Sequence, residues 1–215
     1  NDKVVVMIDS VGNLASKKEL EDAINEKSVA DMSRAKALKG LFRMTTPYLN
    51  MKNIPLIAVN HTYMEIGLFP KAIVSGGTGI YYSADNIWIL GRQQDKQGTE
   101  VKGYHFVINV EKSRYVKEKS KIPISVSWDG GVQSYSGLLD VGLAGNYVAK
   151  PSNGWYCRVD RTTGELIDPR VREKDTLEEQ FWLPIFESTD FKDYIKSKFA
   201  IGGKSDNELV LEDTA

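Results

Sequence analysis

The chain has 215 residues, enough to bury a sizeable core, and carries 28 Lys and Arg against 29 Asp and Glu. This balance excludes a broadly basic nucleic-acid-binding protein, although it allows a local basic groove. The single cysteine, Cys157, excludes a disulfide framework and a cysteine-based zinc site and favours a reducing compartment. Because no apolar run approaches the ~20 residues of a membrane helix, we expect no membrane association. The first residue is Asn1 rather than Met, so we expect the chain to start within a longer protein.

The first predicted element is a strand over Val4–Ile8, five consecutive apolar residues typical of a parallel sheet covered on both faces. Asp9 and Ser10 follow it directly. Ligands of parallel sheets bind outside the carboxyl ends of the strands. A carboxylate there can hold Mg²⁺ through water beside a triphosphate, as in the Walker-B half of a nucleotide site. The alternative is that Asp9 only caps the following turn.

Two helices and a second strand follow. Ser16–Glu19 is a capping-box pattern that opens a short charged helix. Residues 28–31 open a longer amphipathic helix, which we expect Pro47 to break. Residues 55–60 (PLIAVN) predict a second buried strand ending at Asn60 and His61. We expect this end at the same sheet edge as Asp9, where a polar side chain can contact a terminal phosphate and signal its presence to the next loop. The alternative is a structural histidine.

An irregular loop is predicted from His61 to Gly79, before a short helix over Ile80–Ala84. Gly76 and Gly77 allow backbone N–H groups to approach a ligand closely, and Lys71 adds positive charge. Two interpretations remain open: a contact to phosphate or to a nucleic-acid backbone, or a flexible turn into the helix.

Three further strands are predicted at 86–91, 103–110 and 122–128, with a polar turn over Gln93–Thr99 and an antiparallel arrangement that makes the sheet mixed. The segment 111–121 holds five basic and two acidic residues. Lys112 and Arg114 alternate in it, so both can point to one side. Fixed cations suit phosphate charge, particularly that of a phosphate bound by a neighbouring subunit. The alternative is a solvated surface segment.

The final part of the chain predicts a small α+β appendage. It comprises a short helix (Ser136–Ala144), a β-hairpin turning near Thr163–Gly164, and two amphipathic helices (Thr176–Phe186 and Thr189–Phe199). The last ten residues contain four acids and no base, the composition of an acidic tail.

Several chemistries lack support in the sequence. Gly203-Lys204-Ser205 resembles the end of a phosphate-binding P-loop, but Lys198 stands where its first glycine is required, and the segment follows a helix instead of a strand. The chain has neither a G-x-S-x-G nor an H-E-x-x-H motif, and only two histidines, so hydrolase and zinc-enzyme sites are unsupported.

Taken in order, these segments closely resemble the UvsX recombinases of tailed phages, relatives of bacterial RecA, over nearly the whole chain. The resemblance lies in VVVMIDSVGNLASKKELEDAINEKSVADMSRAKALKGLFR, IPLIAVNHTY, SGGTGIYYSADNIWILG, VEKSR, SGLLDVGL and KPSNGWY. It implies an α/β fold: a RecA-like mixed, mainly parallel sheet flanked by helices. This would be a partial ATPase core (1–148), followed by a small α+β C-terminal domain (149–200) and an acidic tail (201–215). The family forms filaments on single-stranded DNA, holds ATP between adjacent subunits and promotes homologous pairing and strand exchange.

The resemblance also implies roles for individual residues. Asp9 and Ser10 correspond to the Walker-B pair, with Mg²⁺ on Asp9 through water. His61 corresponds to the catalytic residue that senses the γ-phosphate, where RecA has glutamine. Lys112 and Arg114 correspond to cations that reach the neighbouring subunit's ATP. Two DNA-binding loops correspond to Lys18–Val29 and Thr62–Thr78, and the implied DNA-binding residues are Arg34, Lys71, Gly76, Gly77 and Thr78.

The implied partners are single-stranded DNA, other copies of the protein, and phage single-strand-binding and mediator proteins, in the cytoplasm of an infected bacterial host. One alternative is a naturally P-loop-less RecA-like module that binds DNA or regulates a full-length recombinase filament. Another is an unrelated α/β binding domain. An in-frame P-loop upstream separates the first alternative from the recombinase, and salt-dependent binding to single strands separates both from the second.

We predict that the 215-residue chain alone neither binds ATP tightly nor hydrolyses it, because the family's P-loop and catalytic glutamate precede the segment that this chain resembles. For the same reason we expect an uncovered apolar edge or face that favours self-association. ATP binding is measured by calorimetry and hydrolysis by phosphate release. ATPase activity that is reproducibly abolished by Asp9→Ala contradicts the prediction.

Overall fold

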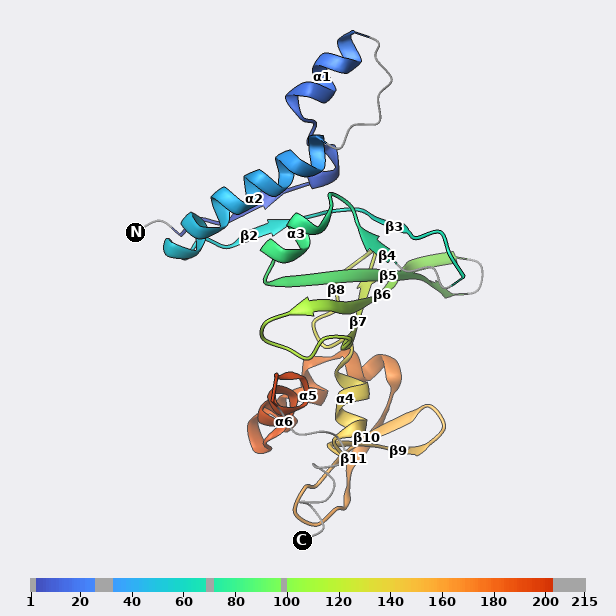
Figure 1. Ribbon diagram of the computed structural model, residues 1–215. Coiled ribbons are helices and arrows are strands. Elements are labelled where there is room, and N and C mark those ends of the chain that lie inside the picture. The colour runs from blue at the N-terminus through green and yellow to red at the C-terminus, as the bar shows by residue number, and fades with distance from the viewer. Residues whose placement is uncertain (1–2, 26–32, 69–71, 98–99, 203–215) are drawn as a thin grey trace. The chain divides into compact units, whose positions relative to one another are not determined.

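The computed structural model describes residues 3–25, 33–68, 72–97 and 100–202, and it divides the chain into two compact units, Asn1–Ile87 and Trp88–Ala215. Within these ranges, no helix is long and apolar enough to cross a membrane. The elements of the first unit are β1 (Val6–Ile8), the 3₁₀ turn η1 (Val11–Asn13), α1 (Lys17–Ile24), α2 (Ser33–Met51), β2 (Leu56–Ala58), β3 (Thr62–Met64), β4 (Ala72–Val74) and α3 (Thr78–Ser83) (Figure 1).

A parallel pair of strands forms the centre of the first unit, as the sequence predicts. Val6 of β1 lies opposite Leu56 of β2, and Ile8 lies opposite Ala58. One face packs under α2 in a small core, made of Val11, Leu38 and Phe42 with Ile8, Leu56 and Ile80 against them (Figure 1). The prediction of burial on both faces is wrong, because the side chains of the other face are 49–70% exposed: Val5, Met7, Ile57 and Val59. This exposed face agrees with the expected uncovered apolar surface, whereas self-association stays a prediction.

The prediction of a mainly parallel sheet also needs correction. In the described part of the chain, β1–β2 is parallel, whereas β3–β4, β6–β7, β7–β8, β9–β10 and β10–β11 are antiparallel. The strands form separate small sheets and not one continuous sheet. The α/β class is therefore observed, in sheets that are mostly antiparallel.

The two predicted helices near the start of the chain both form. Ser16 and Glu19 make a complete capping box at the start of α1: the Ser16 hydroxyl accepts a hydrogen bond from the Glu19 N–H at 3.1 Å, and the Glu19 carboxylate accepts one from the Ser16 N–H at 2.6 Å. The predicted start of the second helix, residues 28–31, lies outside the described residues. The predicted break at Pro47 is wrong, since α2 continues to Met51. Pro47 is on the exposed side of the helix, where water can replace the missing backbone donor.

A β-hairpin occupies part of the predicted irregular loop. Strands β3 and β4 pair antiparallel, with Thr62 opposite Val74 and Met64 opposite Ala72. The two segments are rich in β-branched and aromatic side chains, which favour extended structure. The segment predicted as an irregular loop therefore contains two paired strands, β3 near its start and β4 near its end.

The second unit contains the sheet β5-β6-β7-β8 from Trp88 onward. The predicted turn over Gln93–Thr99 is wrong in its first part, because β5 continues to Gln97, and its last two residues lie outside the described residues. The elements of this unit are β5 (Asn86–Gln97), β6 (Glu100–Ser113), β7 (Lys121–Ser127), β8 (Gly131–Val132), α4 (Leu138–Ala144), β9 (Val148–Ser152), β10 (Trp155–Val159), β11 (Leu166–Arg172), the 3₁₀ turn η2 (Glu173–Leu177), α5 (Glu179–Ser188) and α6 (Phe191–Phe199).

The C-terminal elements pack around an aromatic core. Trp182 and Phe191 are stacked at a centroid distance of 5.7 Å, and both are fully buried. The Tyr147 hydroxyl donates to Asp190 at 2.8 Å, and burial raises the pKa of Tyr147 well above its usual range. The predicted hairpin is confirmed as β10–β11, and the two predicted helices are confirmed as α5 and α6 with shifted ends. The predicted domain boundary at residue 148 stays a prediction.

The hairpin turn between β10 and β11 is closed by Asp160. Its carboxylate accepts hydrogen bonds from the backbone N–H groups of Thr162 at 2.7 Å and Thr163 at 3.1 Å. These donors, first that of Thr163 and then that of Thr162, hold the pKa of Asp160 below its usual value. An aspartate that stabilises its own turn explains why the turn forms where the sequence predicts it.

We predict that Trp182→Ala destabilises the second unit by about 3 kcal/mol or more, because it removes a side chain with 0% exposure from the aromatic core. Its neighbour Leu183 is 44% exposed, so Leu183→Ala should cost less than about 1.5 kcal/mol. Urea denaturation followed by circular dichroism measures both. Equal losses in the two variants contradict the packing described here.

Candidate functional site

The ends of β1 and β2 place four polar residues at one edge of the parallel pair. Asp9 and Ser10 follow β1, and Asn60 and His61 follow β2. The Ser10 hydroxyl lies 3.4 Å from Nε2 of His61. Ser10 is buried, whereas Asp9 and His61 are exposed. The buried Ser10 hydroxyl thus contacts the imidazole of His61, and the carboxylate of the preceding residue, Asp9, faces solvent.

Gly12 allows the imidazole of His61 to approach the turn after β1. A Cβ atom at Gly12 would lie 2.5 Å from Cδ2 of His61 and 3.1 Å from Nε2, so a larger residue there would force the His61 ring to shift. Sequence reasoning missed this residue. The only local signal is a glycine two residues after Ser10, in the turn that ends the strand.

Arg34, in the first turn of α2, bonds to the same turn. Its Nη2 group donates to the carbonyl of Val11 at 3.2 Å and also to the carbonyl of Gly12. Its Nε is buried and has no hydrogen-bond partner among the described residues. The sequence predicts that Arg34 binds DNA; in the structure its guanidinium group faces main-chain carbonyls, and the DNA-binding role stays a prediction.

The backbone of His61 is hydrogen-bonded to Ser75, the residue that follows the second strand of the β3–β4 hairpin. The Ser75 N–H donates to the His61 carbonyl at 2.9 Å, and the Asn60 side-chain amide donates to the Ser75 carbonyl at 2.7 Å. The Asn60 side-chain oxygen accepts from the His61 N–H at 2.9 Å. Two hydrogen bonds therefore join Asn60 and the backbone of His61 to Ser75, at the start of the glycine-rich segment, and the third links Asn60 to His61.

Gly76 and Gly77 lead from Ser75 into α3 with φ of +91° and +79°, the region that favours glycine. A Cβ on Gly76 would lie 2.5 Å from the side chain of Ile80, so the turn also requires its small size. Thr78 is the first residue of α3. Lys71, the remaining predicted DNA-binding residue of this segment, lies outside the described residues.

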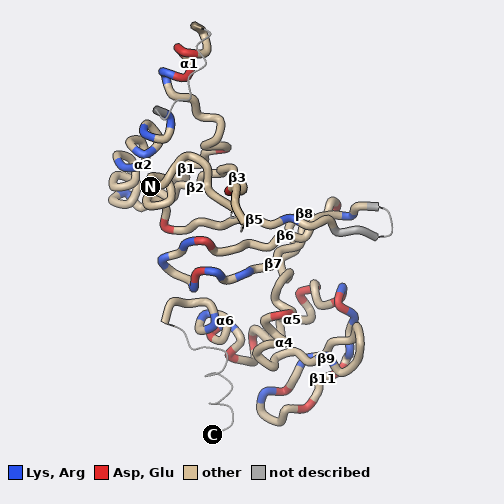
Figure 2. Tube along the Cα trace, turned by 45° about the vertical axis from the view of Figure 1, so that its right-hand side comes forward, with Lys and Arg blue, Asp and Glu red and all other residues tan. Residues whose placement is uncertain are grey.

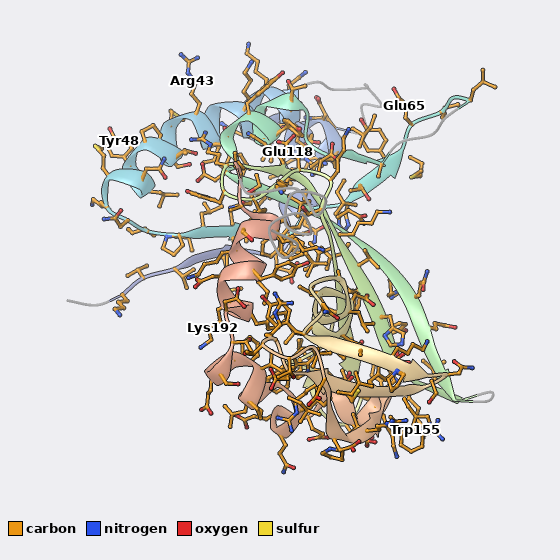
Figure 3. The ribbon with its side chains drawn as sticks, turned by 90° about the horizontal axis from the view of Figure 1, so that it is seen from below. Arg43, Tyr48, Glu65, Glu118, Trp155 and Lys192 are labelled. Atoms are coloured by element: carbon orange, nitrogen blue, oxygen red, sulfur yellow. The ribbon has the colours of Figure 1, made fainter. Side chains whose placement is uncertain are left out.

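A basic face on α2 was missed by sequence reasoning. Lys36, Lys39 and Arg43 are exposed at spacings of three and four residues, which place them on one side of the helix. The helix Ser33–Met51 contains no Asp or Glu, and Figure 2 shows Lys and Arg as its only charged residues. Arg43 projects away from the helix in Figure 3. The helical spacing of basic residues without acids was the available signal.

Two apolar side chains stand fully exposed on the hairpin that follows His61. Ile66 is 102% exposed and Leu68 is 95% exposed, next to Glu65, which lies at the outer end of the hairpin in Figure 3. Exposed apolar side chains that gather in one segment suit an interaction with a partner.

Lys112 and Arg114 belong to the second unit. Lys112 is half-buried near the end of β6, and Arg114 is exposed just beyond it. Their predicted role toward the ATP of a neighbouring subunit stays a prediction.

The donor set at the edge fits a water-mediated Mg²⁺ ion. Mg²⁺ keeps several waters and takes one or two protein carboxylates together with substrate phosphates. The exposed Asp9 carboxylate is a group of this kind, although its role toward Mg²⁺ stays a prediction, and the described residues contain no group of three or more metal-binding side chains. The residues present therefore fit a nucleotide-bound ion and not a protein-enclosed one.

The chain is similar to known recombination proteins. A family model described as "Bacteriophage T4, Recombination and repair protein, C-terminal domain" matches residues 135–195. The chain is 54% identical over 213 residues to "Recombination and repair protein" of Enterobacteria phage T4, covering 97% of this chain and 54% of that protein. It is 24% identical over 155 residues to "Protein RecA" of Bdellovibrio bacteriovorus, covering 71% and 40%. With "Protein RecA" of Bacteroides thetaiotaomicron it shares 25% over 194 residues, covering 87% and 58%.

These matches define the class of the chain as a RecA-related recombination protein. Within that class, the chain belongs to the family of the phage T4 recombination and repair protein, which confirms the resemblance to UvsX. The chain spans about half the length of the curated relatives that it matches.

We predict that Asn60→Asp loosens the junction between His61 and the hairpin. A carboxylate still accepts from the His61 N–H but cannot donate to the Ser75 carbonyl. Loss of one hydrogen bond of about 1 kcal/mol should speed amide exchange at Ser75 about fivefold. Hydrogen–deuterium exchange measures this, with Asn50→Asp on the exposed side of α2 as the control. Unchanged exchange at Ser75 shows that the Asn60 amide does not hold the junction.

Proposed function

We propose that this chain is part of a DNA-dependent ATPase recombinase that forms filaments on single-stranded DNA and promotes homologous pairing and strand exchange. Its family membership supports the recombinase class. The observation that carries the proposal is the hydrogen-bonded junction of His61, Asn60 and Ser75. It joins the edge where a nucleotide would lie to the segment that leads into α3, within one compact unit.

On the DNA side, Lys36, Lys39 and Arg43 are proposed to neutralise phosphates without reading sequence. The exposed side chains of Ile66 and Leu68 suit contacts between unstacked bases, a use that nucleic-acid-binding proteins make of apolar side chains. The backbone at Gly76, Gly77 and Thr78 adds close contacts to the sugar-phosphate chain. Such contacts favour any single strand, as a recombinase requires.

On the nucleotide side, ATP with Mg²⁺ supplies a terminal phosphate whose presence distinguishes two states of the protein. Asp9 is proposed to hold the ion through water, with Ser10 beside it. His61 is proposed to contact the terminal phosphate and to shift its own backbone, and with it Ser75. Lys112 and Arg114 are proposed to reach the ATP of an adjacent copy, so that nucleotide binding and filament assembly depend on each other.

In this proposal the partners are single-stranded DNA and further copies of the protein, with phage single-strand-binding and mediator proteins acting during loading. The setting is the infected bacterial cell, where a phage recombination protein acts.

We predict that the chain binds oligothymidylate with a strong dependence on salt, and that Lys36→Gln, Lys39→Gln and Arg43→Gln together weaken binding at low salt about tenfold. Because each phosphate contact contributes about −0.7 to the slope of log affinity against log salt, the triple variant should lower the steepness by about 2. Fluorescence anisotropy measures both quantities.

The control for this experiment removes the same charge elsewhere, with Lys52→Gln, Lys174→Gln and Lys192→Gln at exposed positions outside α2. This variant should retain most of the affinity. A loss as large as that of the first variant shows that the α2 face makes no specific contribution and contradicts the proposed DNA surface.

A further inference from the structure

Arg34 connects the helix that carries the basic face to the turn that carries Ser10. It lies two residues before Lys36 on α2, and its guanidinium group donates to the carbonyls of Val11 and Gly12. A guanidinium group presents its donors in a rigid planar fork, so it fixes two neighbouring acceptors at once. Lysine places the same charge there but offers a flexible point donor.

The Val11–Gly12 turn, which Arg34 holds, also fixes the position of the His61 imidazole. The ring lies against Gly12 so closely that a Cβ atom there would overlap Cδ2. The Nε2 atom of the same ring also lies 3.4 Å from the buried hydroxyl of Ser10. A shift of the Val11–Gly12 backbone therefore has to move the His61 ring or break this contact.

A second connection closes the path from His61 back to α2. Ser75 is bonded to His61 and Asn60, and the residues after it pack on the helix. A Cβ on Gly77 would meet Ala35 at 3.5 Å, and one on Gly79 would lie 2.6 Å from the side chain of Lys39. The first turns of α2 thus contact both sides of the site, the turn after β1 and the start of α3.

We propose that Arg34 is a positioning residue that links the basic face of α2 to His61 through the Val11–Gly12 turn. This inference rests on the function proposed for α2 and His61. DNA bound on α2 displaces the first turn of the helix slightly, Arg34 carries that displacement to the carbonyl of Gly12, and the imidazole changes its position. The reverse coupling follows by thermodynamic necessity, so a ligand on His61 changes the affinity of α2 for DNA.

A series of contacts from α2 to His61 does not by itself establish energetic coupling. The test therefore has to measure the response of His61 to a ligand on α2. The chain offers a favourable probe because His61 and His105 are its only histidines. His105 lies in the second unit, where its Nδ1 is 2.9 Å from the Ser125 hydroxyl, and it serves as an internal reference. Imidazole nuclear magnetic resonance signals report both rings separately.

The first experiment uses the chain without DNA. Arg34→Lys, Arg34→Gln and Gly12→Ala should each move the His61 signals, whereas those of His105 should stay in place. Lys52→Gln, which removes an exposed charge just beyond the far end of α2, should move neither. His61 signals that stay at their wild-type positions in both Arg34 variants overturn the link between Arg34 and His61.

The second experiment adds oligothymidylate to the same proteins. Both proteins are compared at saturating oligothymidylate, so that a change in affinity does not enter, and in Arg34→Lys the DNA-induced shift of the His61 signals should fall to about half or less of that in wild type. A purely structural role of Arg34 predicts an undiminished shift once the variant is folded, and that result overturns the proposed coupling.

The two experiments separate this inference from the proposed function. If the wild-type chain does not bind oligothymidylate, the proposed DNA surface is wrong and the coupling to DNA fails with it. The spectra without DNA still decide whether Arg34 positions His61. If DNA binds and the His61 signals do not respond even in wild type, the DNA surface stands and the inference about Arg34 is wrong.

Discussion

The parallel register of β1 and β2 determines where the polar groups of the candidate site lie. Because Ile8 is opposite Ala58, both strands run toward the same edge, and the residues that follow them meet there. An antiparallel pairing would place Ser10 and His61 at opposite ends of the sheet. The contact between Ser10 and His61 depends on this register, and it connects the turn that Arg34 holds with the residue that bonds to Ser75.

The junctions around His61 are few and individually weak, which suits a switch. A hydrogen bond contributes about 1 kcal/mol to a folded structure, and coupling between two sites amounts to about 1–3 kcal/mol. The three bonds that join His61, Asn60 and Ser75 are therefore of the right size to transmit a ligand's effect without stabilising one state irreversibly. The ring of His61 faces Ser10 and Gly12, whereas its main chain faces Ser75, so one residue belongs to both sides of the site.

Local signals in the sequence predict local structure, and the misses concern contacts between distant segments. The capping box of Ser16 and Glu19 and the turn of Asp160 are complete within four residues, and both form as expected. Pro47 ends a helix only when the lost hydrogen bond is not replaced, which depends on exposure and not on sequence. The partners of Arg34 lie more than twenty residues away, and the need for Gly12 arises from His61, so no nearby pattern could reveal either.

The sequence predicts that both faces of β1 and β2 are buried, but one face is exposed. Apolar residues on both faces of a parallel strand pair are typical of a sheet covered by a layer on each side. Within the described residues, α2 covers one face of β1 and β2, and the side chains of Met7 and Ile57 on the other face remain exposed. The apolar composition of the strands thus favours a cover on both faces, whereas the described residues cover one of them. Because Met7 and Ile57 are register partners, whatever covers this face has to be apolar and has to lie across both strands.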